Sequence, residues 1–260
     1  MFTLAKSTFT QYLVNIETLG RICNFYLYII SNPVQRRIEA KQIIKQIFNI
    51  GVQTTSIIIL SALFVGSVLA IQGHYILNLF NANDQLGQLV TLSVLRELGP
   101  VITCLLFIGR AGSAITSEIG IMQLTDQINA LKSMEISIER FVLFPRFIAT
   151  LISLPLLTML FNAFAIIGAY SVSICILELD KGMFLISINQ YVNFWHDVAT
   201  GLFKTIFFSL IIGCLALYYG INAAKSATGV AQASTKTVVY SSIAILLCDY
   251  ILTSMLMRIW

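Results

Sequence analysis

Residues 95–134 carry the information that decides the fold, and they read LRELGPVITCLLFIGRAGSAITSEIGIMQLTDQINALKSM. The stretch begins with the charged pair Arg96 and Glu97, runs through apolar residues that Pro100 should bend, and reaches a glycine-rich segment around Arg110. A long apolar run with a cation at its end is typical of a helix that crosses a membrane. The sequence therefore predicts a bent span followed by a more polar segment on the cytoplasmic side.

The charged pair lies deep in the membrane if Arg110 marks the inner surface. Arg96 precedes Arg110 by fourteen residues, and at about 1.5 Å per helical residue it lies about 21 Å away across an apolar core of about 30 Å. Each charge at mid-membrane costs about 2.5 to 3.5 kcal/mol, so the pair requires mutual neutralisation, a wet cavity or a polar ligand headgroup. Alternatively, the span begins near Leu98 and both charges lie among the lipid headgroups.

The composition places the chain among multi-span membrane proteins. Hydrophobic residues make up 57% of the sequence, charged residues 11%, and the mean hydropathy is +0.85, which excludes a soluble domain. A chain of 260 residues has room for about five spans of about 20 residues. We therefore expect an all-α membrane protein in which residues 1–260 form one domain. The net charge of +4 lies mainly beside the spans, which indicates membrane topology rather than nucleic-acid binding.

The first residues predict helices that lie on the membrane rather than across it. Apolar residues recur at three- and four-residue steps over residues 9–30, which is typical of an interfacial helix. Residues 35–48 bring four cations to the start of the first long apolar run, and cations there belong on the cytoplasmic or equivalent side. We expect interfacial or elbow helices over residues 1–48 and a transmembrane bundle over residues 51–257.

Long apolar runs place the five expected spans. They cover residues 51–76, a second run that ends near Arg110, and residues 141–177, 199–220 and 237–257. In the first span, Ala62, Gly66 and Ala70 recur at four-residue steps. Such a pattern either lets two helix backbones approach closely or reflects the general abundance of small residues in membrane helices.

The third apolar run, residues 141–177, is long enough for one tilted span or for two short spans divided at Pro155. A single span keeps most cations on one side of the membrane, so we expect one. Residues 78–88 and the aromatic-rich residues 178–197 should then face the outside. The small-residue loop 222–236 should face the cytoplasm.

An amphipathic segment is expected after the second span. Its apolar side chains form one stripe while polar ones fill the remaining faces, and the stripe consists of Ile121, Leu124, Ile128, Leu131 and Ile138. A short cytoplasmic helix of this kind either docks a partner protein or lies on the membrane surface without one.

Asp249 is a second intramembrane acid, because it lies deep in the expected fifth span. Its partner should be a hydroxyl, an amide or Arg96, and the alternative is a structural polar residue with a local cap. The five cysteines are scattered singly and the two histidines lie far apart, so we expect neither a metal site nor a disulfide framework.

The sequence contains no motif for direct catalysis. GxxxxGK[ST], HExxH and GxSxG are all absent, so we expect no enzymatic activity and no cofactor on this chain. Three classes remain: the membrane subunit of a pump powered by a separate ATPase, a self-sufficient ion-coupled carrier, and a non-transporting assembly factor. An ion-coupled carrier usually has repeated halves with broken helices, and the sequence shows no such repeat.

Several motifs make the chain resemble a known family. They are Arg96-Glu97-Leu98-Gly99-Pro100, Gly109-Arg110-Ala111-Gly112-Ser113-Ala114, Glu118-Ile119-Gly120, Thr125-Asp126-Gln127-Ile128, Pro145-Arg146, Leu154-Pro155-Leu156-Leu157 and a tail from Gly229 to Asp249. Over nearly its full length the chain is similar to the MlaE permease family, the membrane subunits of lipid-transporting ABC systems that include the plastid trigalactosyldiacylglycerol transporter. Two departures are mild: Asp126 stands where many relatives carry Glu, and Glu135 where many carry Gly or Ala.

The resemblance implies a homodimer that encloses a phospholipid pocket open toward the outer leaflet. An ABC ATPase that binds ATP would lie below it, and a lipid-binding mammalian-cell-entry (MCE) domain protein above it. Helical spacing adds an apolar wall on the side of Glu97, so the expected lipid-pocket residues are Arg96, Glu97, Pro100, Val101 and Cys104. The expected ATPase-coupling residues are Glu118, Asp126, Ile128, Leu131 and Lys132.

The composition and the resemblance together suggest a location. Ile, Asn, Phe and Tyr are frequent, which is typical of an AT-rich genome such as that of an organelle. We expect a multi-pass protein of a plastid (chloroplast) membrane, with a bacterial inner membrane as the alternative.

Overall fold

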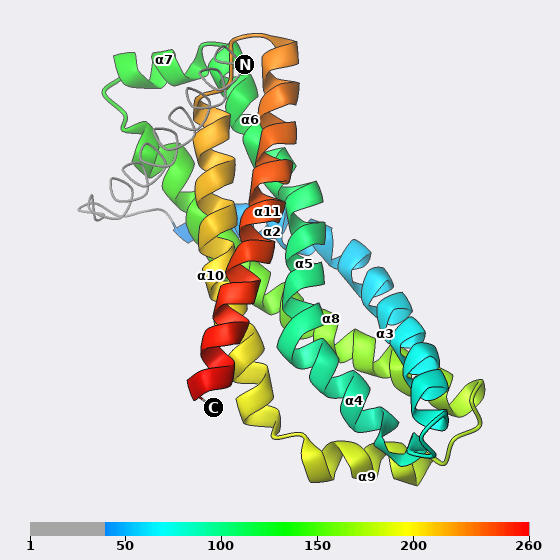
Figure 1. Ribbon diagram of the computed structural model, residues 1–260. Coiled ribbons are helices and arrows are strands. Elements are labelled where there is room, and N and C mark those ends of the chain that lie inside the picture. The colour runs from blue at the N-terminus through cyan, green and yellow to red at the C-terminus, as the bar shows by residue number, and fades with distance from the viewer. Residues whose placement is uncertain (1–39, 260) are drawn as a thin grey trace, which may run out of the picture.

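The computed structural model describes residues 40–259 and folds them into helices, with no strand in that range (Figure 1). The α-helices are α2 (Ala40–Ile50), α3 (Thr55–Asn78), α4 (Leu86–Ser93), α5 (Gly99–Phe107), α6 (Ser113–Leu124), α7 (Gln127–Ser133), α8 (Phe144–Cys175), α9 (Lys181–Tyr191), α10 (Phe194–Ile221) and α11 (Ala227–Ile259). Short 3-10 turns η1 (Val52–Thr54) and η2 (Asn83–Gln85) and π turns η3 (Val94–Leu98), η4 (Ile108–Gly112) and η5 (Glu139–Leu143) join some of them. The expected interfacial helix at 9–30 lies outside the described residues.

Five helical stretches are long and apolar enough to cross a membrane. They are Lys41–Asn78, Asn83–Leu124, Glu139–Cys175, Trp195–Ile221 and Ala227–Leu256. The prediction of an all-α protein with five spans is therefore confirmed. The prediction of one span over residues 141–177 is also confirmed, because α8 continues through Pro155 without a break.

Two spans are longer than predicted. The second helix does not end near Arg110 but continues to Leu124, and the fifth begins at Ala227 rather than at residue 237. The reason is tertiary: the added turns pack against each other, and the Ser117 hydroxyl oxygen lies 2.7 Å from that of Ser234. Hydroxyl pairs of this kind hold membrane helices together where apolar packing alone does not. The first part of the predicted amphipathic segment, with Ile121 and Leu124, thus belongs to the extended second helix, whereas Ile128 and Leu131 lie on the short α7.

Backbone-to-backbone packing joins α3 to α8. A Cβ atom added at Gly66 would lie 1.8 Å from the carbonyl oxygen of Ala165, and one added at Gly168 would lie 2.4 Å from that of Leu63. Only glycine permits this approach, and Ala62 beside it is fully buried. The small-residue pattern of the first span is therefore a real packing surface.

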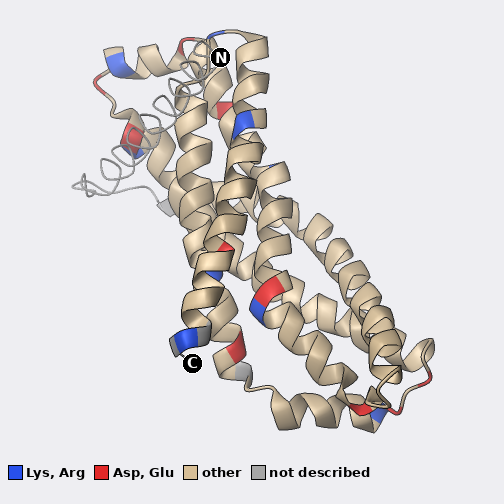
Figure 2. Ribbon diagram, viewed as in Figure 1, with Lys and Arg blue, Asp and Glu red and all other residues tan. Residues whose placement is uncertain are grey.

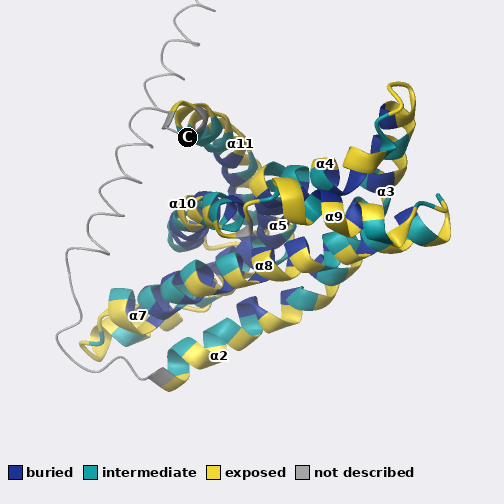
Figure 3. Cartoon of the chain, turned by 90° about the horizontal axis from the view of Figure 1, so that it is seen from below, coloured by how far each residue is buried: buried dark blue, intermediate teal, exposed yellow. Residues whose placement is uncertain are grey.

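The described helices form an elongated bundle with two distinct ends (Figure 1). The helix α7 and the turn between α10 and α11 lie at one end, and α9 lies at the other. Charged residues are sparse along the helices (Figure 2), as a lipid environment requires. Buried residues gather where α5, α8 and α10 meet (Figure 3), so the middle of the second helix is enclosed by its neighbours.

Candidate functional site

The π turn η3 determines where Arg96 and Glu97 point. Pro100 has no N–H group, so it cannot donate the regular helical hydrogen bond to the carbonyl of Arg96, four residues back. The N–H of the preceding residue, Gly99, bonds to the carbonyl of Val94, five residues back, which makes this a π turn. Single π turns inside α-helices are common at functional sites. Here the wide turn presents two adjacent charges to the neighbouring spans.

Close packing of α10 brings its charges to this turn. A Cβ atom at Gly201 would lie 2.3 Å from the carbonyl oxygen of Leu95, so glycine is what allows α10 to touch η3. This contact places Asp197 about one turn before Gly201, and Lys204 about one turn after it, on either side of the π turn.

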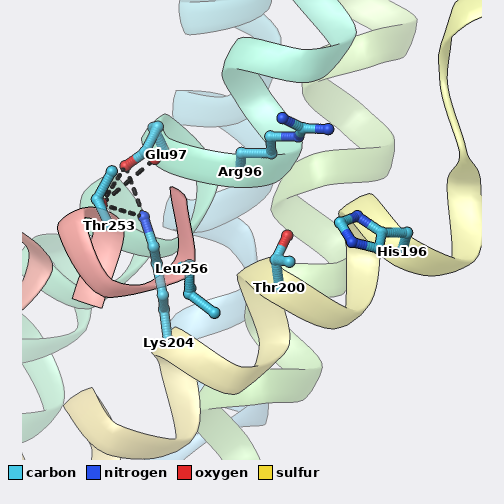
Figure 4. Close-up of a pocket in the computed structure, with 7 residues that line it drawn as sticks. All are labelled: Arg96, Glu97, His196, Thr200, Lys204, Thr253 and Leu256. Carbon is cyan, nitrogen blue, oxygen red and sulfur yellow. Dashed lines mark hydrogen bonds and ion pairs between the residues drawn. The ribbon is translucent and has the colours of Figure 1, made fainter. Parts of the chain in front are cut away.

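Glu97 belongs to a polar cluster that joins three spans (Figure 4). The Lys204 ammonium donates to Glu97 Oε2 at 2.6 Å and to Thr253 Oγ1 at 2.6 Å. It also forms an ion pair with Asp249 Oδ1 at 3.2 Å. Because the Lys204 side chain is only 2% exposed, its charge is stabilised almost entirely by these three groups.

Arg96 forms a separate ion pair. Its Nε and Nη2 atoms lie 2.7 and 2.6 Å from Oδ1 of Asp197, whose side chain is fully buried. The His196 Nδ1 atom lies 3.6 Å from the same oxygen. Arg96 and Glu97 therefore do not neutralise one another; each has its own partner on α10.

A cavity of about 260 Å³ lies beside the two ion pairs (Figure 4). It is lined by Arg96, Glu97, His196, Thr200, Lys204, Thr253 and Leu256, which come from the second, fourth and fifth spans. Pockets that enclose a drug-sized ligand measure roughly 300 to 1,000 Å³. The cavity in one chain therefore suits part of a molecule, such as a polar headgroup, rather than a whole lipid.

The remaining predicted pocket residues lie elsewhere. Pro100 and Cys104 are buried in the bundle, Val101 is half-buried against it, and none of the three lines the cavity. The prediction assumed a regular helix from Glu97 onward, whereas the π turn shifts the register between Glu97 and α5. The apolar wall expected below Glu97 is thus part of the protein core.

Asp249 has a partner that was not among those predicted, since it pairs with Lys204 rather than with Arg96, a hydroxyl or an amide. Lys204, Asp197 and Thr253 were missing from the predicted site. One signal was available: intramembrane charges must be neutralised, and the expected fourth span, residues 199–220, contains Lys204.

The predicted coupling residues divide into two places. Glu118 lies on α6, where its carboxylate pairs with Arg146 of α8 at 3.2 Å. Asp126 lies at the turn between α6 and α7, and the other three lie on α7, with Ile128 buried, Leu131 half-buried and Lys132 exposed.

Asp126 anchors that turn. It adopts a left-handed backbone with φ of 56° just before α7. Its carboxylate accepts hydrogen bonds from Lys225 at 2.6 Å and from Asn129 at 2.8 Å. The hydrogen bond and positive charge of Lys225 lower the pKa of Asp126. The turn is thereby tied to the loop between α10 and α11.

Comparison with known proteins identifies the family. The sequence model of the family described as permease MlaE matches residues 43–255, which is most of the chain. This chain belongs to the MlaE permease family. The five helical stretches that are long and apolar enough to cross a membrane fit a multi-pass membrane protein of this family.

Named relatives of this MlaE-family chain come from bacteria and from a plant. It is 42% identical over 242 residues to the intermembrane phospholipid transport system permease protein MlaE of Haemophilus influenzae, with 92% of each chain covered. It is 32% identical over 259 residues to a probable ABC transporter permease protein of Rickettsia bellii, with 100% of each covered. It is 26% identical over 226 residues to the chloroplastic protein trigalactosyldiacylglycerol 1 of Arabidopsis thaliana, with 87% of this chain and 64% of that protein covered.

Proposed function

We propose that this chain is the permease subunit of an ABC transporter that moves phospholipids or related lipids between membranes. A separate ATPase subunit would bind and hydrolyse ATP, and an MCE-domain protein would exchange lipid with the permease. The relatives support this proposal, because the Haemophilus protein is named as a phospholipid transport permease. They include bacterial and chloroplastic proteins, so a bacterial inner membrane and a plastid membrane both remain candidate locations.

The observation that carries the proposal is the charged cavity between three spans. Arg96 keeps 48% of its side chain exposed while it pairs with Asp197, so its guanidinium can bind a lipid phosphate without a large rearrangement. Glu97 is 39% exposed and offers a carboxylate to a headgroup amine or hydroxyl. A site with both charges exposed suits a zwitterionic or polar headgroup.

We propose that a second copy of the chain completes the pocket. The fifth span buries the smallest share of its length within one chain, and its outward face carries large apolar side chains such as Leu247 and Tyr250. Thr253 and Leu256 of the same helix line the cavity. A partner seated on α11 would therefore enlarge the cavity toward the size of a lipid.

We also propose that α7 and the preceding turn contact the ATPase. Leu131 is only half-buried and Lys132 beside it is exposed, and the ion pair of Asp126 with Lys225 fixes the turn to the neighbouring loop. A force applied to α7 would thus reach α6, α10 and α11 together. Residues 40–259 would respond as one permease domain.

Affinity purification in mild detergent tests the proposed function. We expect an ATPase and a phospholipid to co-purify with the chain, both identified by mass spectrometry. A chain that purifies without an ATPase and shows ion-dependent uptake would contradict the proposal and support an ion-coupled carrier.

Leu131→Glu tests the ATPase contact. It should leave the protein in the membrane but detach the ATPase, because an unpartnered charge in a protein contact typically costs several kcal/mol. Leu185→Glu is the matched control, because this leucine is exposed on α9 at the opposite end of the bundle. If both variants retain the ATPase, α7 is not its docking site.

A further inference from the structure

A second charged cavity lies where the elbow helix α2 meets the second span. Its volume is about 230 Å³, and it is lined by Asn49, Ile50, Gln53, Arg110, Ala111, Ala114, Ile115 and Glu118. These residues come from α2, η1, η4 and α6. None of them lines the cavity around Glu97, so the two cavities are separate.

Arg110 is held in this cavity by neutral groups. Its Nη1 atom donates to the Asn49 carbonyl at 2.8 Å and to the Thr54 hydroxyl at 3.0 Å, and its Nη2 atom donates to the Gln53 side-chain oxygen. A guanidinium carries five N–H donors, so these three bonds leave two donors for another acceptor. They also leave its positive charge unbalanced.

This lack of a carboxylate distinguishes Arg110 from the comparable cations of the described chain. Arg96, Lys204, Arg146 and Lys225 each contact an Asp or Glu carboxylate. The other described cations without an ion pair are exposed: Lys41, Lys45, Lys132, Arg140, Lys181, Lys236 and Arg258. Within residues 40–259, Arg110 is thus the cation that is partly withdrawn from solvent and still free to attract an anion.

The surroundings of Arg110 define the kind of anion. Asn49 and Gln53, which carry amide groups, line the cavity together with the apolar residues Ile50, Ala114 and Ile115. The Glu118 carboxylate is already balanced by Arg146. A positive cavity lined by both polar and apolar residues matches a phosphate joined to a glycerol and acyl chains.

The location favours a membrane lipid as its source. Elbow helix α2 is strongly amphipathic and exposes Lys41 and Lys45, as expected of a helix on the cytoplasmic surface of a membrane. Anionic and zwitterionic headgroups lie at that depth. A Cβ atom added at Gly109, which precedes Arg110 in η4, would meet nothing within 4 Å, so the described chain leaves that face of the π turn open.

We propose that Arg110 binds the phosphate of a phospholipid from the inner leaflet, at a site separate from the cavity around Glu97. The site holds the headgroup between α2 and α6, where it bridges the elbow helix to the second span. This proposal does not depend on lipid transport by the protein.

A cysteine at Ala114 reports on this site, because Ala114 is exposed and lines the cavity. The complete purified complex carrying Ala114→Cys is labelled with a maleimide, and the labelled peptide is quantified by mass spectrometry. We expect short-chain phosphatidylglycerol to slow the labelling. Diacylglycerol of the same chain length, which lacks the phosphate, should not.

Arg110→Gln in the same background should weaken this protection about tenfold, as expected for the loss of one charge-assisted interaction. Lys45→Gln is the matched control on the same elbow helix and should leave protection unchanged. Equal protection by diacylglycerol, protection by inorganic phosphate alone, or full protection in Arg110→Gln would each overturn the proposal. The comparison of the two lipids needs no Arg110 variant, so it decides even where that variant does not fold.

Discussion

The two π turns of the second span hold their charges in opposite ways. At η3, Arg96 and Glu97 each contact a group of opposite charge on α10, and a third carboxylate, Asp249, joins them. At η4, Arg110 contacts only a carbonyl, a hydroxyl and an amide. The two charges of the first turn are therefore already neutralised within the chain, although both side chains stay partly exposed to a ligand. The second turn keeps an unbalanced positive charge that a ligand can meet directly.

The two turns show where in the bundle a charge can stay without a partner of opposite charge. Lys204 is 2% exposed and Asp197 is fully excluded from solvent, and at such positions an unpaired charge is costly. Arg110 contacts the amphipathic helix α2, and we expect water and lipid headgroups to solvate it there. Substitutions should therefore be much more damaging at η3 and its partners than at η4.

The largest effect is expected for Lys204→Met. It leaves Glu97 and Asp249 without their shared cation, and breaking a buried ionic network in this way costs about 3 to 5 kcal/mol. Thermal unfolding of the detergent-solubilised protein should show a large loss of stability. Lys181→Met, at an exposed lysine, is the control. Adding Asp249→Asn to Lys204→Met should recover part of the loss; no recovery would mean that the lysine acts mainly by packing.

A smaller loss is expected for Arg96→Leu. It leaves the buried carboxylate of Asp197 without its cation, but Arg96 is itself half exposed, so we expect a loss of about 2 to 3 kcal/mol. The same unfolding measurement applies. Combining it with Asp197→Asn should restore most of the stability. If the double variant is less stable than Arg96→Leu, the two residues do not act as a pair.

A smaller effect still is expected for Arg110→Gln. Its three bonds go to neutral groups that water can replace at the membrane surface, so we expect a loss of about 1 to 2 kcal/mol. Thermal unfolding of Arg110→Gln and Arg96→Leu, measured under the same conditions, would show which of the two π turns contributes more to stability. An equal or larger loss for Arg110→Gln would remove the contrast between them.

The smallest effect is expected at the exposed pair of Asp126 and Lys225. The pKa of Asp126 is lowered from its ordinary value of 3.8 by Lys225, so the pair stabilises the folded state above that pH and loses its contribution as the pH falls through the lowered value. Asp126→Asn should therefore be slightly less stable than the unmodified chain at neutral pH, and the difference should vanish in acid and shrink in high salt. A difference that persists in acid would show that the introduced amide disturbs the left-handed turn instead.

The sequence was sufficient for the fold class but not for the helix ends. The lengths of the apolar runs predicted five spans, and the distribution of cations favoured one span rather than two around Pro155; both predictions agree with the structure. Arg110 was expected to end the second span, but groups from α2 and η1 satisfy it, so the helix can continue. Such compensation comes from another part of the chain and has no local signature.

The sequence pointed to two of the residues that line the cavity around Glu97 but not to their ionic partners. Arg96 and Glu97 line the cavity, and their charge in an apolar run was the signal. Their partners are fixed by tertiary packing, because Gly201 brings α10 against the π turn. Pro100 and Cys104 do not line this cavity, because a π turn changes the residue count per turn and so the faces that a regular helical wheel would assign.

The distance along the chain between the paired charges bears on how this protein is made. Arg96 and Asp197 are 101 residues apart, and Glu97 and Lys204 are 107 apart. At synthesis rates of about 5 to 20 residues per second, the second span waits roughly 5 to 20 s for its partners to leave the ribosome. During that interval its two charges are unpaired, and lipid alone does not retain them at their final depth. The second and fourth spans should therefore enter their final positions together, late in biogenesis, so that a nascent chain stopped before Lys204 would still be held by the insertion machinery.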